Sequence, residues 1–184
     1  MIDWSHQDRI ISKLTQVVRS GKRKPVIVSP TGSGKSTVAR RIVQQAREKN
    51  SKVLFLAPRR ELIYQIHENF ESHGIHCGII MAGENRDIFA PVQIASFDTL
   101  NARAMRTNRM MMPDADIVIV DEAHISVSES RLKILAHYEG KVVIGLTATP
   151  VGANGAGLGI FYDSMVNEVT VRELMDKGVL CNAR

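Results

Sequence analysis

Short runs of β-branched and other apolar residues alternate along the chain with segments of helical periodicity. The runs that predict strands are residues 25–29, 53–57, 75–81, 92–96, 117–120 and 142–146. Helical spacing of apolar residues predicts helices over 6–20, 36–49, 60–72, 97–106 and 128–137. Continuous apolar strands separated by helices are typical of a parallel sheet that is covered on both faces. The pattern therefore predicts an α/β sandwich, with candidate ligand sites at the carboxyl ends of its strands.

The turn between the first predicted strand and the following helix reads SPTGSGKS, from Ser29 to Ser36. Successive backbone N–H groups in such a turn form a cradle for anions, which the positive end of the next helix dipole reinforces. Gly32 and Gly34 permit positive φ angles and close backbone approach. Lys35 is suited to the β- and γ-phosphates of a nucleotide, and the Ser36 hydroxyl to Mg²⁺. The segment is a candidate phosphate loop, although Ser29 stands where the general pattern has glycine.

A second candidate motif, IVIVDEAH, covers residues 117–124. Asp121, at the carboxyl end of the predicted strand, is suited to water-mediated coordination of Mg²⁺, and Glu122 can polarise a water that attacks a γ-phosphate. His124 follows the acidic pair by two residues, and by itself it could be a capping or hydrogen-bonded core histidine. Alone, the segment could also be a strand followed by a solvated acidic turn. The phosphate loop upstream favours the catalytic interpretation.

The charges are distributed unevenly along the 184 residues. Residues 1–60 hold 14 Lys and Arg against 3 Asp and Glu, whereas residues 61–184 hold 10 against 16. The first third is therefore suited to a phosphate-bearing ligand. Cys77 and Cys181 lack the spacing of a disulfide scaffold or a zinc site, and no signal peptide or membrane-spanning apolar run occurs. We expect a soluble, cytoplasmic protein with no membrane partner.

Together the two motifs resemble those of superfamily 2 helicases and translocases, whose second motif has a DEAH form and whose phosphate loop has a small first residue. Other segments are similar to further motifs of that family. Residues 57–62 (APRREL) with Gln65 resemble motif Ia, 95–100 (ASFDTL) a nucleic-acid-contacting motif, 147–149 (TAT) the third motif, and Gln7 the adenine-reading glutamine. Segments containing Gly157, Phe161, Arg172 and Gly178 resemble the branch related to type III restriction ATPase subunits and phage or bacterial DNA-repair helicases.

The resemblance implies a P-loop NTPase fold, a RecA-like three-layer α/β/α sandwich with a mainly parallel sheet. Residues 1–184 would form the first RecA-like, ATP-binding domain, with an N-terminal helix over 1–22 and the P-loop core over 23–184. The second RecA-like domain, which carries the arginine that completes the ATP site, is absent from the sequence. We therefore interpret the chain as the N-terminal half of a longer helicase that hydrolyses ATP, and we expect the isolated half to be weakly active.

The resemblance also implies a role for individual residues. The catalytic group would be Lys35, Asp121, Glu122 and His124. ATP would be bound by Gln7, Pro30, Thr31, Gly32, Ser33, Gly34, Lys35, Ser36 and Thr37, and Mg²⁺ by Ser36 and, through water, Asp121. Nucleic acid, with DNA favoured over RNA, would contact Pro58, Arg59, Arg60, Gln65, Ser96 and Thr99. Thr147 and Thr149 would couple nucleotide state to movement, and His124 would link the nucleotide to this third motif.

Other classes of phosphate-loop protein fit the sequence less well. A small-molecule kinase would need an arginine-bearing lid and an acceptor pocket, and a GTPase would need an Asn-Lys-x-Asp motif; none of these occurs. A binding module with a vestigial nucleotide site is disfavoured because Lys35, Asp121 and Glu122 are all present. Nucleic-acid-stimulated ATP turnover by the longer parent protein would separate these classes.

Overall fold

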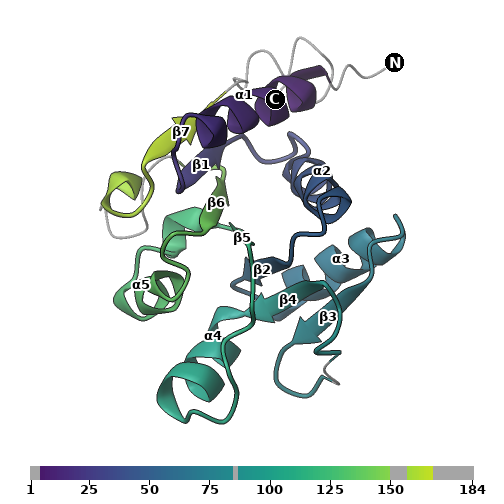
Figure 1. Cartoon of the computed structure of the whole chain (residues 1–184), viewed down its shortest axis with the longest axis vertical. Coiled ribbons are helices and arrows are strands. Elements are labelled where there is room, and N and C mark those ends of the chain that lie inside the picture. Colours follow the sequence, from purple (N-terminus) through teal and green to yellow (C-terminus); the bar gives the residue numbers. More distant parts are fainter. Residues whose placement is uncertain (1–4, 85–86, 150–156, 168–184) are drawn as a thin grey trace, which may run out of the picture.

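The strands form one parallel sheet, with the order β3-β4-β2-β5-β6-β1-β7 (Figure 1). A computed structural model of the chain describes residues 5–84, 87–149 and 157–167. Within them the strands are β1 (Pro25–Val28), β2 (Val53–Ala57), β3 (Cys77–Ile80), β4 (Val92–Ser96), β5 (Ile117–Val120), β6 (Val142–Thr147) and β7 (Ser164–Val166). All their pairings are parallel, so the predicted α/β architecture is confirmed.

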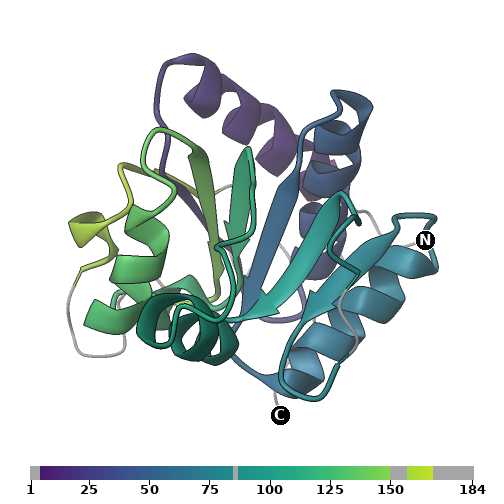
Figure 2. The same cartoon turned by 60° about the horizontal axis from the view of Figure 1, so that its bottom comes forward.

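Helices cover both faces of the sheet, as Figure 2 shows for α2 and α3 on one side and α4 and α5 on the other. The first layer consists of α1 (Ser5–Arg19), α2 (Lys35–Glu48) and α3 (Arg60–Glu71). The second consists of α4 (Phe97–Leu100), a π-helix η1 (Asn101–Arg106) and α5 (Glu129–Ala136). Single-turn 3₁₀ helices, η2 (Ala123–Ile125) and η3 (Leu158–Ile160), follow β5 and precede β7.

Alternation along the central strands divides the apolar core into two parts. In β2, Phe55 and Ala57 pack with buried residues of α1, α2 and α3, whereas Leu54 and Leu56 pack with those of α4 and α5. Successive side chains of a strand point to opposite faces, so a strand buried on both faces must be apolar throughout. This rigid centre holds the loops at the carboxyl edge of the sheet, where both sequence motifs lie.

Three elements differ from the sequence-based expectation. The helix expected over 97–106 is a short α-helix that continues as a π-helix, and the strand expected over 75–81 is limited to Cys77–Ile80. The strand β7 was not predicted; it pairs with β1 through Pro25 and Ser164. Much of the glycine-rich stretch 152–159, the segments 172–174 and 178–180, and Cys181 lie outside the described residues.

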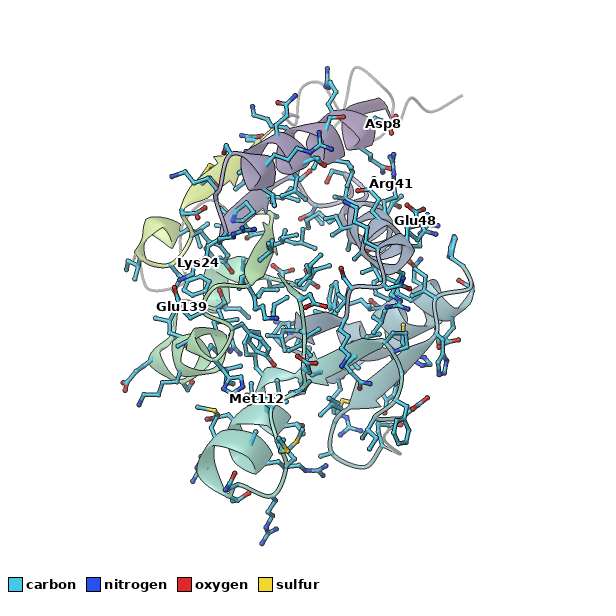
Figure 3. The ribbon with its side chains drawn as sticks, in the orientation of Figure 1. Asp8, Lys24, Arg41, Glu48, Met112 and Glu139 are labelled. Atoms are coloured by element: carbon cyan, nitrogen blue, oxygen red, sulfur yellow. The ribbon has the colours of Figure 1, made fainter. Side chains whose placement is uncertain are left out.

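Partly exposed ion pairs join neighbouring elements of the fold. Asp8 of α1 faces Arg41 of α2, and Lys24, just before β1, faces Glu139 (Figure 3). Lys24 Nζ and Glu139 Oε2 are 3.0 Å apart. Both pairs are partly solvent-exposed, so each contributes little stability by itself. Among the residues that the structure describes, no helix is long and apolar enough to cross a membrane.

Candidate functional site

The phosphate loop connects β1 directly to the N-terminus of α2. Gly32 and Gly34 have φ angles of 79° and 84°, in the left-handed region where a side chain would be strained. Gly34 is the N-cap of α2, which makes no side-chain capping bond. The first N–H groups of a helix lack partners within the helix, so those of α2 are available to an anion at this end.

The Lys35 side chain folds back over the loop. Its Nζ donates hydrogen bonds to the carbonyl oxygens of Ser29, at 3.2 Å, and Pro30, at 3.3 Å. Burial lowers the pKa of Lys35, while the charges of Glu122 and Asp121 act in the opposite direction. The ammonium group thus lies between the loop and the acidic pair, where a bound anion would compensate for the hydration that burial has removed.

A cavity of about 540 Å³ brings the two sequence motifs together. One part of its wall is the phosphate loop with the start of α2, and another is the acidic pair that follows β5. The side of α3 that faces α2 closes the cavity with mostly apolar residues. The residues of the wall include Thr31, Gly32, Gly34, Lys35, Ser36, Leu62, Gln65, Ile66, Asn69, Phe70, Asp121 and Glu122.

The acidic pair has an unusual backbone. Glu122 has φ 50° and ψ 51°, a left-handed conformation that is strained for a residue with a side chain and is often found at functional sites. Its N–H donates to Asp121 Oδ1 at 3.0 Å. Burial raises the pKa of Asp121 to about 6, with a further contribution from the charge of Glu122. Lys35 and the Glu122 N–H oppose this increase.

Thr147, at the end of β6, connects the acidic turn to the phosphate loop. His124 Nδ1 lies 3.0 Å from Thr147 Oγ1 and 3.3 Å from Glu122 Oε2. The Thr147 hydroxyl donates to the carbonyl of Thr149 and accepts from the Thr149 N–H, both at 3.0 Å. Because that hydroxyl has one proton, Nδ1 of His124 must be the donor to it. The Nδ1–H group therefore also faces the Glu122 carboxylate.

The donor set around the cavity fits Mg²⁺ bound together with a phosphate ligand. The Ser36 hydroxyl is exposed, and Ser36 and Asp121 line the same cavity. Both offer the hard oxygen ligands that Mg²⁺ prefers, with further positions left for waters and phosphate oxygens. Across the described part of the chain, no three His, Cys, Asp or Glu side chains gather as a metal site.

Helix α1 touches the phosphate loop through a residue that sequence reasoning missed. His6 is fully buried, and its Nε2–H donates to the Ser33 carbonyl at 2.8 Å. Its neighbour Gln7, the expected adenine reader, is 4% exposed and is not among the described residues that line the cavity. No local sequence signal reveals the His6 contact, because the two residues are 27 positions apart.

Most of the residues expected to contact nucleic acid lie where β2 and β4 end. These strands pair with Ala57 opposite Ser96, so the segments that follow them leave the carboxyl edge side by side. Arg59 is exposed. The Arg60 guanidinium already donates to the Ala82 carbonyl at 3.0 Å and to the Tyr64 hydroxyl at 3.3 Å. Arg59 is therefore the more available of the two cations, with Pro58 half-buried beside it.

The other expected contacts are divided between two places. Ser96 and Thr99 are buried, and Ser96 Oγ caps α4 by accepting the Thr99 N–H. Their side chains thus serve the start of α4 and present little surface. Gln65 lies on the wall of the cavity that holds Lys35 and Glu122. Its position groups it with the phosphate loop.

Comparisons with known proteins agree with this geometry. The family model for the type III restriction enzyme, res subunit, matches residues 3–152. A 51.5 kDa protein of a Lactococcus phage (isolate 7-9) is 33% identical over 151 residues, which are 82% of this chain and 30% of that protein. The DNA 3'-5' translocase XPB2 of Sulfurisphaera tokodaii is 29% identical over 85% of this chain and 33% of its own length. The chain thus spans about a third of these relatives.

A solved structure has the same fold. The helicase domain of Hef from Pyrococcus furiosus superimposes with a TM-score of 0.64 and 24% identity, covering 85% of this chain and 37% of that one. The seven-stranded sheet and its two helical layers are accordingly those of a RecA-like P-loop domain.

Proposed function

Because this chain belongs to the family of the type III restriction enzyme res subunit, we propose that it is the ATP-binding motor domain of an ATP-dependent helicase or translocase. It acts when joined to a second RecA-like domain. It works in the cytoplasm and moves along nucleic acid. The observation that carries the proposal is the single cavity that Lys35, Ser36, Asp121 and Glu122 share.

Binding of ATP begins at the loop. The N–H groups of the loop and of the first turn of α2 receive the β- and γ-phosphates, as helix N-termini commonly do. Lys35 Nζ leaves the carbonyls of Ser29 and Pro30 and pairs with phosphate oxygens, which are stronger partners for a half-buried ammonium group. Pro30, Thr31 and Thr37 flank the contact between Lys35 and the phosphates. Gln7, in α1, is the candidate contact to the adenine base.

The acidic turn supplies the chemistry of hydrolysis. Ser36 and, through water, Asp121 would hold Mg²⁺, and the bound ion would supply positive charge to neutralise the phosphates. Glu122 accepts a proton from the attacking water. The strained conformation of Glu122 and its contact with His124 Nδ1 fix the direction of that carboxylate. Thr147 and Thr149 connect it to the end of β6, so that nucleotide state can be passed to the rest of the motor.

Nucleic acid lies along the carboxyl edge, over the ends of β2 and β4. Arg59 contacts a backbone phosphate, with Pro58 and Arg60 beside it, while Ser96 and Thr99 hold the start of α4 next to this surface. Contacts of this kind position a strand without reading its sequence. DNA is favoured over RNA because one relative is named as a DNA translocase.

The experiment that tests the proposal compares ATP turnover by this chain and by a longer protein that includes the second domain. Without the arginine of that domain, turnover is expected to be slower by about 10³–10⁵. Single-stranded DNA should stimulate only the longer protein, and a single-stranded RNA of the same sequence should stimulate it less. Turnover by the 184-residue chain at the rate of the stimulated two-domain protein would contradict the proposal.

A further inference from the structure

Ser33, in the middle of the phosphate loop, uses all its polar groups inside the protein. Its N–H donates to the Pro30 carbonyl at 3.2 Å, and its hydroxyl is bonded to that of Ser29 at 2.7 Å. Its carbonyl accepts from His6 Nε2 at 2.8 Å. Ser33 is 1% exposed, whereas its neighbours Gly32 and Gly34 line the cavity. Ser33 therefore points away from the ligand side of the loop.

Ser29 ties this arrangement to the sheet. It is 2% exposed, and its N–H donates to the Thr147 carbonyl at 2.9 Å. Its side-chain Oγ is directed to Ser33. A glycine at position 29, as in the general phosphate-loop pattern, would provide no such bond. The residue that departs from the pattern is thus the one that fastens the middle of the loop to its beginning.

We propose that Ser29, Ser33 and His6 are positioning residues that fix the backbone of the loop before nucleotide arrives, and that their side chains do not touch it. The inference rests on the nucleotide site proposed above and deepens it, because it moves Ser33 from ligand contact to support. Gly32 and Gly34 leave the loop many accessible conformations. Anchoring the residue between them from two sides removes conformational entropy that binding would otherwise have to remove.

The test is a double-mutant cycle on ADP affinity, measured by calorimetry on the 184-residue chain. Ser29→Ala and Ser33→Ala each break the same hydrogen bond between the two hydroxyls, so each should weaken ADP binding about three- to tenfold. The double variant should be no weaker than either single variant, because the bond is already lost. His6→Leu removes the hydrogen bond to the Ser33 carbonyl, which is the second anchor. The decrease in ADP affinity that it causes should add to the decrease caused by Ser29→Ala.

Ser126→Ala is the matched control. Ser126 is also fully buried, and its hydroxyl bonds to the Ala123 carbonyl and the Tyr162 hydroxyl, outside the loop. This variant should lower the melting temperature and leave ADP affinity unchanged. Amide hydrogen exchange of Gly32 and Gly34 in the nucleotide-free chain gives a readout without ligand, and it should accelerate in Ser29→Ala and Ser33→Ala.

The outcomes separate this inference from the proposed function. If the unchanged chain binds no ADP, the nucleotide site itself is wrong. If it binds ADP and Ser29→Ala and Ser33→Ala bind equally well, with unaltered exchange at the two glycines, the anchoring role is overturned and the site stands. Additive losses in the double variant would also overturn it, since they would mean that each hydroxyl contacts the ligand separately.

Discussion

His124, in the turn after β5, and Thr147, at the end of β6, are joined by a 3.0 Å hydrogen bond between Nδ1 and Oγ1. The backbone carbonyl of Thr147 also accepts the N–H of Ser29 at the start of the phosphate loop. One fully buried threonine therefore contacts both motifs that form the cavity. A change at Thr147 should affect how the acidic turn is held more than how phosphate is bound, because only its side chain faces His124.

We expect Thr147→Val, which keeps the shape and removes the hydroxyl, to lower ATP turnover by the two-domain protein while ADP affinity remains within about twofold. The substitution leaves the donors of His124 and Thr149 without their acceptor, which should cost about 1–3 kcal/mol of folding stability. Turnover, calorimetric affinity and thermal unfolding measure the three effects. Thr147→Ser, which keeps the hydroxyl, is the control. A Thr147→Val enzyme with normal turnover would argue against coupling through this bond.

Lys35→Ala and Glu122→Gln should separate binding from chemistry. Lys35→Ala removes the cation that faces the phosphates and should weaken ADP binding by about 10–100-fold, the value of a charge-assisted hydrogen bond. Glu122→Gln keeps the shape and should leave binding nearly unchanged, while turnover by the two-domain protein falls by about 10²–10⁴ because proton acceptance is lost. Equal loss of binding in both variants would contradict these roles.

Several features of the fold follow from local sequence because burial on both faces demands it. Strands β2, β4 and β5 have the predicted bounds, since each is buried along nearly all of its length between two neighbouring strands. In contrast, β7 has three residues and a single neighbour, and nothing local distinguishes it. The π-helix η1 continues α4 without a break, and hydrophobic periodicity does not distinguish such a π-helical segment from an α-helix.

The candidate site, like the fold, was predictable where local sequence determines it. Residue types at fixed spacing indicated Lys35, Asp121 and Glu122, and the positive φ of Gly32 and Gly34 was expected from the turn. The bond from His6 to Ser33 and the place of Gln65 on the cavity wall depend on how α1 and α3 pack against α2. Contacts between distant elements have no periodic signature in the sequence.

The stability of the nucleotide-free, Mg²⁺-free chain should fall as pH rises through the range in which Asp121 ionises. Burial raises the folded-state pKa of Asp121 to about 6, from 3.8. Between these values the folded state binds more protons than the unfolded state, so the slope of stability with pH is negative. The loss should be on the order of 3 kcal/mol above pH 6. Urea unfolding at several pH values should show it, and Asp121→Asn should remove this part of the slope.

Gly145 in β6 should be intolerant of a side chain. A Cβ there would lie 2.7 Å from the ring of Tyr162 and 2.9 Å from Cβ of Ala123. Such overpacking in a buried strand costs about 1–3 kcal/mol, so Gly145→Ala should lower the unfolding midpoint. Gly159→Ala is the control, because no atom lies within 4 Å of its Cβ position and its φ is not in the left-handed region. Equal midpoints for the two variants would mean that Tyr162 moves aside freely.

Arg59 should account for more of the nucleic-acid affinity than Arg60, because the Arg60 guanidinium is already bound to Ala82 and Tyr64. In the two-domain protein, Arg59→Ala should weaken single-stranded DNA binding about equally across sequences. It should also reduce the log–log salt slope by about 0.7, the value for one lost phosphate contact on a single strand. Arg60→Ala should change the slope less.

The matched control is Arg109→Ala, since Arg109 is exposed and precedes β5, at the opposite end of the sheet. ADP affinity should be unchanged in all three variants, because the phosphate loop follows a different strand. A salt titration of oligonucleotide affinity measures the slope for each protein. If none of the three variants reduces the slope, the segment after β2 is not part of the nucleic-acid site. If only Arg60→Ala reduces it, that guanidinium must leave the Ala82 carbonyl for a phosphate.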